Sequence, residues 1–145
     1  MAARFDPHHP STLAIYCSDG RFTHAVEDHC EELGHERIDT MTLPGGPALL
    51  TGWPADLSEV HVFSRAAHFL IESHQIKHVF LFAHEGCGFY RARCGRLADA
   101  QIRRLQIEHL RAAQASLARL PREITVTSCY ASTANGAVVF ADVTR

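Results

Sequence analysis

The sequence has no long apolar run and no large excess of charge of either sign. No run among its 145 residues approaches the ~20 apolar residues that a membrane-spanning helix needs. The first ten residues, MAARFDPHHP, contain no apolar core, so we expect no signal peptide. The formal net charge is only −2 at pH 7, which gives no indication of a nucleic-acid or membrane partner. We therefore expect neither a membrane protein nor a nucleic-acid-binding protein.

The five cysteines are an odd number and do not suggest a disulfide framework. Reduced thiols fit this count best, so we expect a cytoplasmic protein. Cys30 and Cys129 lie in apolar patterns and are expected to act as small core residues, whereas Cys94 lies in a polar stretch. The 11 histidines are mostly expected to be solvated or locally hydrogen-bonded, although one of them could shuttle protons.

The hydrophobic pattern predicts one α/β domain over residues 1–145, in which residues 1–11 form a flexible arm. Apolar runs predict strands at residues 13–17, 78–83 and 123–130, and a weak alternation predicts one at 37–41. Helical spacing predicts helices at residues 21–33, 58–74 with Ser58 as N-cap, and 102–120, and a loop at residues 48–56. Asn135-Gly136 predicts a hairpin into an antiparallel edge strand at 137–143. Together these elements give a mostly parallel sheet of about five strands with helices on its faces.

Two of the predicted strands end in residues that bind metals. Cys17, Asp19 and Arg21 occupy alternate positions, so an extended chain would present all three on one side. His84 and Cys87 follow another apolar run, in a loop that contains glycine. Thiolate and imidazole are the ligands that zinc prefers. If the two strands are neighbours, their carboxyl ends meet at one crevice, which would bring the two groups together.

The pattern CxDxR after one strand and HxxCG after another resembles the signature of the β-class carbonic anhydrases. The resemblance implies that Cys17, His84 and Cys87 are the protein ligands of Zn²⁺ at a site with an open fourth position. It also implies that Asp19 and Arg21 are catalytic. Asp19 would orient a zinc-bound hydroxide, Arg21 would hold Asp19, and Asp19 could become a fourth ligand in a closed state.

The resemblance extends over about residues 13–143 and implies reversible hydration of carbon dioxide to bicarbonate. It further implies the strand order 2-1-3-4-5 and a homodimer or a higher even oligomer. LPGGP at residues 43–47 replaces the Arg-Asn-Ala-Gly run that is common in the family, and Gly20 replaces a serine. The chain also lacks the N-terminal helices that usually embrace the partner subunit, so LPGGP and Trp53 are the expected subunit contacts.

Two other functions remain open from the sequence. One is a zinc hydrolase on the same scaffold that acts on another small electrophile, such as an analogue of CO₂. The other is a non-catalytic zinc protein whose site is closed by Asp19 or by another fourth ligand.

Overall fold

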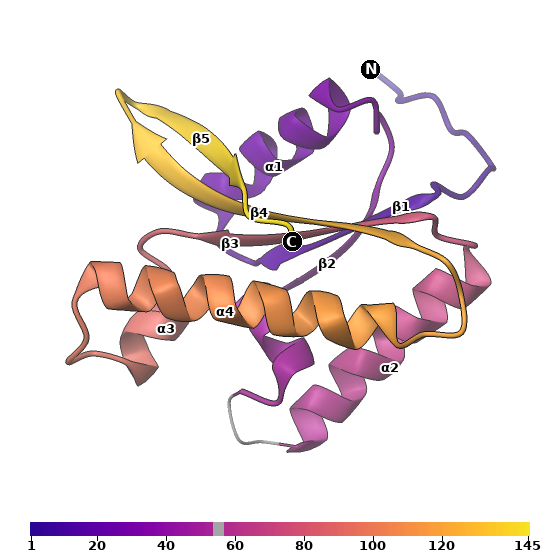
Figure 1. The fold of residues 1–145 in the computed structure, drawn as a ribbon. Coiled ribbons are helices and arrows are strands. Elements are labelled where there is room, and N and C mark those ends of the chain that lie inside the picture. Colours follow the sequence, from indigo (N-terminus) through magenta and orange to yellow (C-terminus); the bar gives the residue numbers. More distant parts are fainter. Residues whose placement is uncertain (54–56) are drawn as a thin grey trace.

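The computed structural model describes residues 1–53 and 57–145 (Figure 1). Its elements, in chain order, are β1 (Thr12–Cys17), α1 (Gly20–Glu32), β2 (Asp39–Leu43), the 3₁₀ helix η1 (Gly46–Thr51), α2 (Leu57–Ser73), β3 (His78–His84), α3 (Gly88–Arg93), α4 (Asp99–Ala118), β4 (Thr125–Ala134) and β5 (Ala137–Asp142). Among the described residues, no helix is both long enough and apolar enough to cross a membrane.

The five strands form one sheet in the order β2-β1-β3-β4-β5, which confirms the predicted α/β fold and strand order. The pairs β1–β2, β1–β3 and β3–β4 are parallel, and β4–β5 is antiparallel. β2, the next strand in the chain, lies on one side of β1, and β3 lies on the other side of β1. The carboxyl ends of β1 and β3 therefore meet at the point where the direction of winding reverses.

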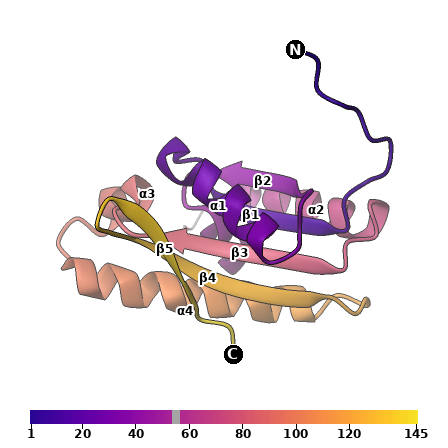
Figure 2. The ribbon, with the colours of Figure 1, turned by 90° about the horizontal axis from the view of Figure 1, so that it is seen from above.

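Helices cover both faces of the sheet (Figures 1 and 2). Leu13 and Ile15 of β1 belong to the core cluster that also contains buried residues of α2 and α4. Ala14 and Tyr16 point to the opposite face and pack in a second cluster with residues of α1. This alternation follows from the two-residue period of a strand, and it explains why β1 reads as a continuous apolar run.

The hairpin between β4 and β5 has the geometry that its sequence predicts. Its two central residues, Asn135 and Gly136, have φ angles of 52° and 76°. A type I′ turn needs positive φ at both positions, and asparagine and glycine adopt it with the least strain. The hairpin places β5 antiparallel at the edge of the sheet, as expected.

The segment after β1 and α1 differs from the prediction in three respects. β2 covers Asp39–Leu43 rather than residues 37–41, because its register pairs Leu43 with Cys17 at the end of β1. Residues 46–51 form the buried helix η1 instead of a loop, while 54–56, the end of that predicted loop, lie outside the described residues. α2 begins at Leu57, so Ser58 lies inside its first turn and is not the N-cap.

The arm at residues 1–11 has no strand or helix before Ser11 but contacts the domain. Arg37 donates to the Asp6 carboxylate at 2.9 Å and to the His8 carbonyl at 2.6 Å. The ring of His9 stacks on that of His74, with 3.9 Å between their centroids.

Candidate metal centre

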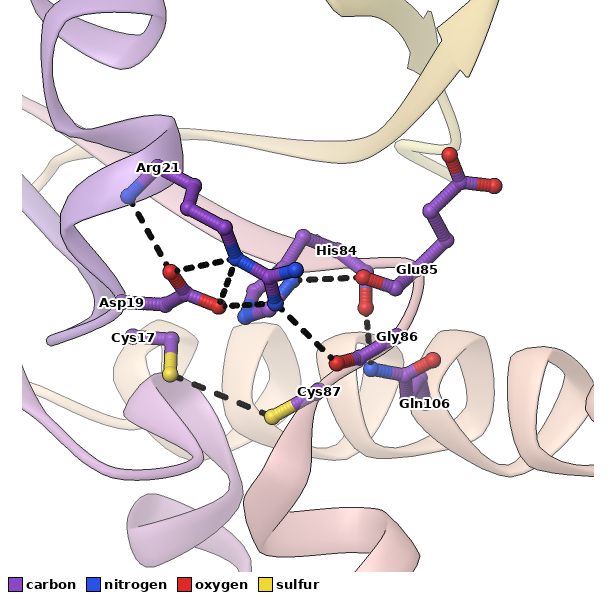
Figure 3. A network of polar contacts seen from close by, with 8 residues as sticks. All are labelled: Cys17, Asp19, Arg21, His84, Glu85, Gly86, Cys87 and Gln106. Carbon is purple, nitrogen blue, oxygen red and sulfur yellow. Dashed lines mark hydrogen bonds and ion pairs between the residues drawn. The ribbon is translucent and has the colours of Figure 1, made fainter.

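The switch point of the sheet brings Cys17, His84 and Cys87 together. Cys17 and His84 are the last residues of the adjacent strands β1 and β3, and Cys87 immediately precedes α3. One donor atom from each of these residues lies within 4.8 Å of the other two. The Sγ atoms of Cys17 and Cys87 are 3.9 Å apart (Figure 3). We call these three residues the Cys–His–Cys cluster.

The imidazole of His84 is oriented for coordination through Nε2. Its Nδ1 lies 2.7 Å from the carbonyl oxygen of Glu85, which can only accept, so Nδ1 carries the proton. Nε2 is then a bare acceptor, and it is buried without a hydrogen-bond partner of regular geometry among the described residues. A buried polar atom in this state is rare in proteins, and its lone pair is available to a metal ion.

The two thiols of the cluster form a coupled pair. The pKa of Cys17 is lowered to about 4, first of all by the contact with the Cys87 thiol and against the opposing effect of burial. His84 and the backbone N–H groups of Gly45 and Asp19 contribute to this lowering. The same contact, together with burial, raises the pKa of Cys87. A cation bound between the two sulfurs would favour the thiolate form of both cysteines.

These observations fit a zinc ion. Two thiolates and one neutral imidazole form a donor set that zinc accepts at about 2.0–2.3 Å. A tetrahedral ion with two such thiolates holds their sulfurs roughly 3.8 Å apart, close to the distance that separates Cys17 and Cys87. Cys17, His84 and Cys87 would therefore hold the metal, and a fourth position would remain for water or substrate.

Asp19 and Arg21 lie beside the cluster and bind each other. Nε of Arg21 donates to both carboxylate oxygens of Asp19, at 3.0 and 3.1 Å, and Nη2 donates to Oδ2 at 2.6 Å. Asp19 is also the N-cap of α1, where Oδ1 accepts from the backbone N–H of Arg21. These hydrogen bonds, above all those of the guanidinium, lower the pKa of Asp19 to about 2. The carboxylate is thus ionised and directed towards Arg21, and it is not among the clustered donor atoms.

Arg21 also joins the two motifs. Its Nη2 atom donates to the carbonyl of Gly86, in the turn between His84 and Cys87, at 3.4 Å (Figure 3). One guanidinium therefore contacts both the loop after β1 and the turn after β3.

A cavity of about 360 Å³ opens beside the cluster. Cys87 and Arg21 line it together with Gln106, Tyr130 and Thr133. A larger, mostly apolar groove of about 750 Å³ lies between β2, α2 and α3 and contains none of the clustered residues. The smaller cavity reaches the cluster at Cys87.

The LPGGP segment supports the loop that carries Cys17. Gly46 packs so closely on β1 that a Cβ atom there would lie 2.7 Å from the carbonyl carbon of Tyr16. Gly45 directs its N–H towards the sulfur of Cys17. Leu43 accepts a hydrogen bond from the backbone N–H of Ser18 at 3.2 Å. Trp53, an expected subunit contact, stacks within this chain on Tyr90, with 4.9 Å between the ring centroids.

The sequence interpretation missed Gln106. Helical spacing in the sequence predicts a buried stripe of α4 through Ile102, Leu105, His109, Ala113, Leu117 and Leu120. The structure confirms three of these, and its buried positions are Ile102, Gln106, Leu110, Ala113 and Leu117. The spacing of three and four residues between these five positions is the signal in the sequence for the buried face of α4. It is difficult to recognise because one of the five, Gln106, is polar. Gln106 donates to the backbone carbonyl of His84 at 2.8 Å, and so belongs to the surroundings of the cluster.

Solved structures with a similar fold are β-carbonic anhydrases. CafA from the fungal pathogen Aspergillus fumigatus has a TM-score of 0.59 at 20% identity, covering 95% of this chain and 78% of that one. A tetrameric β-carbonic anhydrase from Sordaria macrospora has a TM-score of 0.59 at 14% identity, covering 92% and 81%. Isoform I from Trichomonas vaginalis has a TM-score of 0.59 at 14% identity, covering 97% and 87%.

A search of curated protein sequences gave no match. The model of one protein family, described as "Putative carbonic anhydrase", matches residues 8–140. The match covers nearly the whole chain, including both motifs, and agrees with the fold of the solved structures. The chain therefore belongs to this carbonic anhydrase family and is a β-carbonic-anhydrase-like member of it.

Proposed function

We propose that the protein catalyses the zinc-dependent, reversible hydration of carbon dioxide to bicarbonate. The observation that carries this proposal is the Cys–His–Cys cluster with the Asp19–Arg21 pair beside it. Zinc held there would supply a Lewis acid that lowers the pKa of water towards neutrality. The family and the fold support this activity over other zinc chemistries.

The residues around the cluster have distinct roles in this proposal. Asp19 accepts a hydrogen bond from the attacking water and so orients one of its lone pairs towards the substrate. Its low pKa keeps it an acceptor throughout the neutral range. Arg21 holds the carboxylate with three donor contacts and keeps it away from the metal position. The substrate reaches the site through the cavity beside Cys87.

Stopped-flow measurement of CO₂ hydration by zinc-loaded protein tests this function. We expect kcat/KM to rise between about pH 7 and 9, the range in which water on zinc ionises. Asp19→Ala should keep the metal and lose much of the rate, because the group that orients the water is removed while the three metal donors remain. Zinc-replete protein with no hydration above background across this range would contradict the proposal.

A second candidate is hydrolysis of a larger analogue of CO₂ at the same site. The observation that favours it is the size of the cavity, about 360 Å³, together with Arg21 at its lining. A panel of small esters and thiocarbonyl compounds, assayed with the same zinc-loaded protein, separates the two functions.

We also propose a dimer or a larger even oligomer in a reducing compartment such as the cytoplasm. One similar structure is described as tetrameric, and β2 lies at an edge of the sheet next to the apolar groove. The groove includes Leu43 and Val62, whose side chains are 43% and 65% exposed. Thiol ligands must stay reduced, which supports the cytoplasm. A monomer in light scattering at micromolar concentration would contradict the oligomer.

A further inference from the structure

A buried glutamine attaches the turn that carries His84 to the longest helix. Gln106 lies in α4 and is only 2% exposed. Its Nε2 atom donates to the backbone carbonyl of His84 at 2.8 Å (Figure 3). Because a carbonyl can only accept, the side-chain amide must present its nitrogen to His84 and its oxygen elsewhere.

The oxygen of this amide is also engaged. The hydroxyl of Tyr130, in β4, donates to Oε1 of Gln106 at 3.3 Å. Tyr130 is itself 3% exposed, and the guanidinium of Arg103 lies 4.8 Å from the centre of its ring. The amide of Gln106 is thus held at both ends within the protein, and its orientation is fixed.

The peptide group between His84 and Glu85 is held on both edges. Gln106 binds its carbonyl, and its N–H donates to the carbonyl of Ala131 at 2.9 Å. A peptide group is planar, so two contacts on opposite edges fix the orientation of the plane. The direction of the next carbonyl, that of Glu85, depends on this plane, and that carbonyl accepts the Nδ1 proton of His84 at 2.7 Å.

We propose that Gln106 is a positioning residue for the metal centre. Through the peptide after His84 it restricts where the carbonyl of Glu85 can lie, and that carbonyl binds Nδ1 of His84 and so directs the Nε2 lone pair. This inference rests on the zinc site of the proposed function but not on the reaction carried out there. Groups that orient a metal ligand through hydrogen bonds are typically worth about 10- to 100-fold in metal affinity.

The test replaces the amide of Gln106 with a side chain of similar length that cannot donate. Gln106→Met and Gln106→Leu keep most of the volume in the core and remove the donor. The matched control is Gln114→Met. Gln114 also lies in α4 and uses its amide, with contacts of 3.0 Å to Ser128 and Arg145, away from the cluster.

Zinc affinity is measured by competition with a chromogenic chelator, and ligand geometry by the absorption bands of the cobalt-substituted protein. We expect zinc to bind about 10- to 100-fold more weakly in both Gln106 variants, with shifted cobalt bands. Gln114→Met should stay within about twofold of the wild type, with unchanged bands, even if it melts earlier. Circular dichroism checks that each variant is folded.

Two results would overturn the inference. One is wild-type zinc affinity and cobalt bands in both Gln106 variants. The other is an equal loss of zinc affinity in Gln114→Met, which would show that the effect comes from the packing of α4 and not from the contact with His84. Neither readout requires turnover. A wild-type protein that binds zinc but does not hydrate CO₂ would therefore contradict the proposed function and leave the role of Gln106 standing.

Discussion

The sulfur atoms of Cys17 and Cys87 lie 3.9 Å apart although 70 residues separate them in the chain. The contact exists because β1 and β3 are parallel neighbours, so both cysteines follow strands that end at the same edge of the sheet. The separation matches two thiolates on one tetrahedral ion, for which about 3.8 Å is expected. The fold thus brings the donor atoms of a chelating group together.

Removing either thiol should abolish zinc binding. We expect about one zinc per chain in the wild type and almost none in Cys17→Ala or Cys87→Ala, because each ligand supplies a large share of the binding free energy. Atomic absorption on protein dialysed against a weak chelator measures this. Cys94→Ala is the control, since Cys94 is half-buried and outside the cluster. Full retention of zinc in both ligand variants would refute the assignment.

Loss of Arg21 should reduce turnover without loss of metal. Arg21→Ala removes the three guanidinium contacts to Asp19, so the carboxylate is free to rotate towards the metal position. We expect kcat/KM to fall on the order of 100-fold, as is common when a positioning contact is lost. Arg21→Lys should recover only part of the rate, because an ammonium cannot bind a carboxylate as a planar fork.

The control for this variant is Arg37→Ala. Arg37 forms a comparable ion pair, with Asp6 of the arm at 2.9 Å, but lies away from the cluster. Stopped-flow rates and zinc content are measured on all three variants. An Arg21→Ala enzyme with wild-type kcat/KM would exclude the proposed role of the pair.

Much of the fold could be predicted from the sequence, because the strands that carry the site are the most buried ones. β1 and β3 are covered on both faces and therefore appear as uninterrupted apolar runs. The hairpin could be predicted because Asn135 and Gly136 match one turn type. The predicted range of β2, 37–41, begins two residues before the observed one. An edge strand with a single buried residue, Met41, shows little alternation of apolar and polar residues that could define its ends.

The clustered donor residues could also be identified from the sequence, whereas the residues that hold them in place could not. Cysteine and histidine are recognisable as metal-binding residue types in the sequence itself, as at Cys17, His84 and Cys87. The role of Gln106 depends on an amide that bonds a carbonyl 22 residues away, and no local spacing encodes that contact. The role of Gly46 depends on the close approach of two backbone segments. Such relationships arise only from the tertiary structure.

The stability of the protein should decrease as the pH falls through the range in which His78 titrates. Burial, and then the charge of His35, lower the pKa of His78. The folded state therefore prefers the neutral imidazole, and below the unfolded pKa of about 6.5 the unfolded state binds more protons. The contribution of His78 is fully present above that pH and is lost as the pH falls towards the folded pKa.

Urea unfolding of the wild type and of His78→Asn between about pH 7.5 and 5.5 measures this effect. The difference in unfolding free energy between the two proteins should shrink towards low pH, by at most about 1.4 kcal/mol per pH unit. His61→Asn, which removes an exposed histidine of α2, is the control. A difference between wild type and His78→Asn that is constant with pH would contradict the prediction.

Gly46→Ala should damage the fold and the metal site together. Gly46 has φ of 50°, and a Cβ atom there would lie 2.7 Å from the carbonyl carbon of Tyr16 and 2.8 Å from the nitrogen of Cys17. Both atoms belong to the backbone, so no side-chain rotation can relieve the contact. The end of β1 must move, and it carries a donor of the cluster. We expect a loss of about 1–3 kcal/mol in unfolding free energy, together with weaker zinc binding.

Gly136→Ala is the control, because it introduces backbone strain without displacing the end of β1. Gly136 has φ of 76°, also in the left-handed region, but no atom lies within 4 Å of its Cβ position. The substitution should therefore lower stability through strain alone and leave zinc affinity unchanged. If Gly46→Ala also left zinc affinity unchanged while lowering stability, the LPGGP segment would have no role in placing Cys17. If zinc affinity falls in Gly46→Ala but not in Gly136→Ala, the segment that replaces the common Arg-Asn-Ala-Gly run supports the metal ligand Cys17.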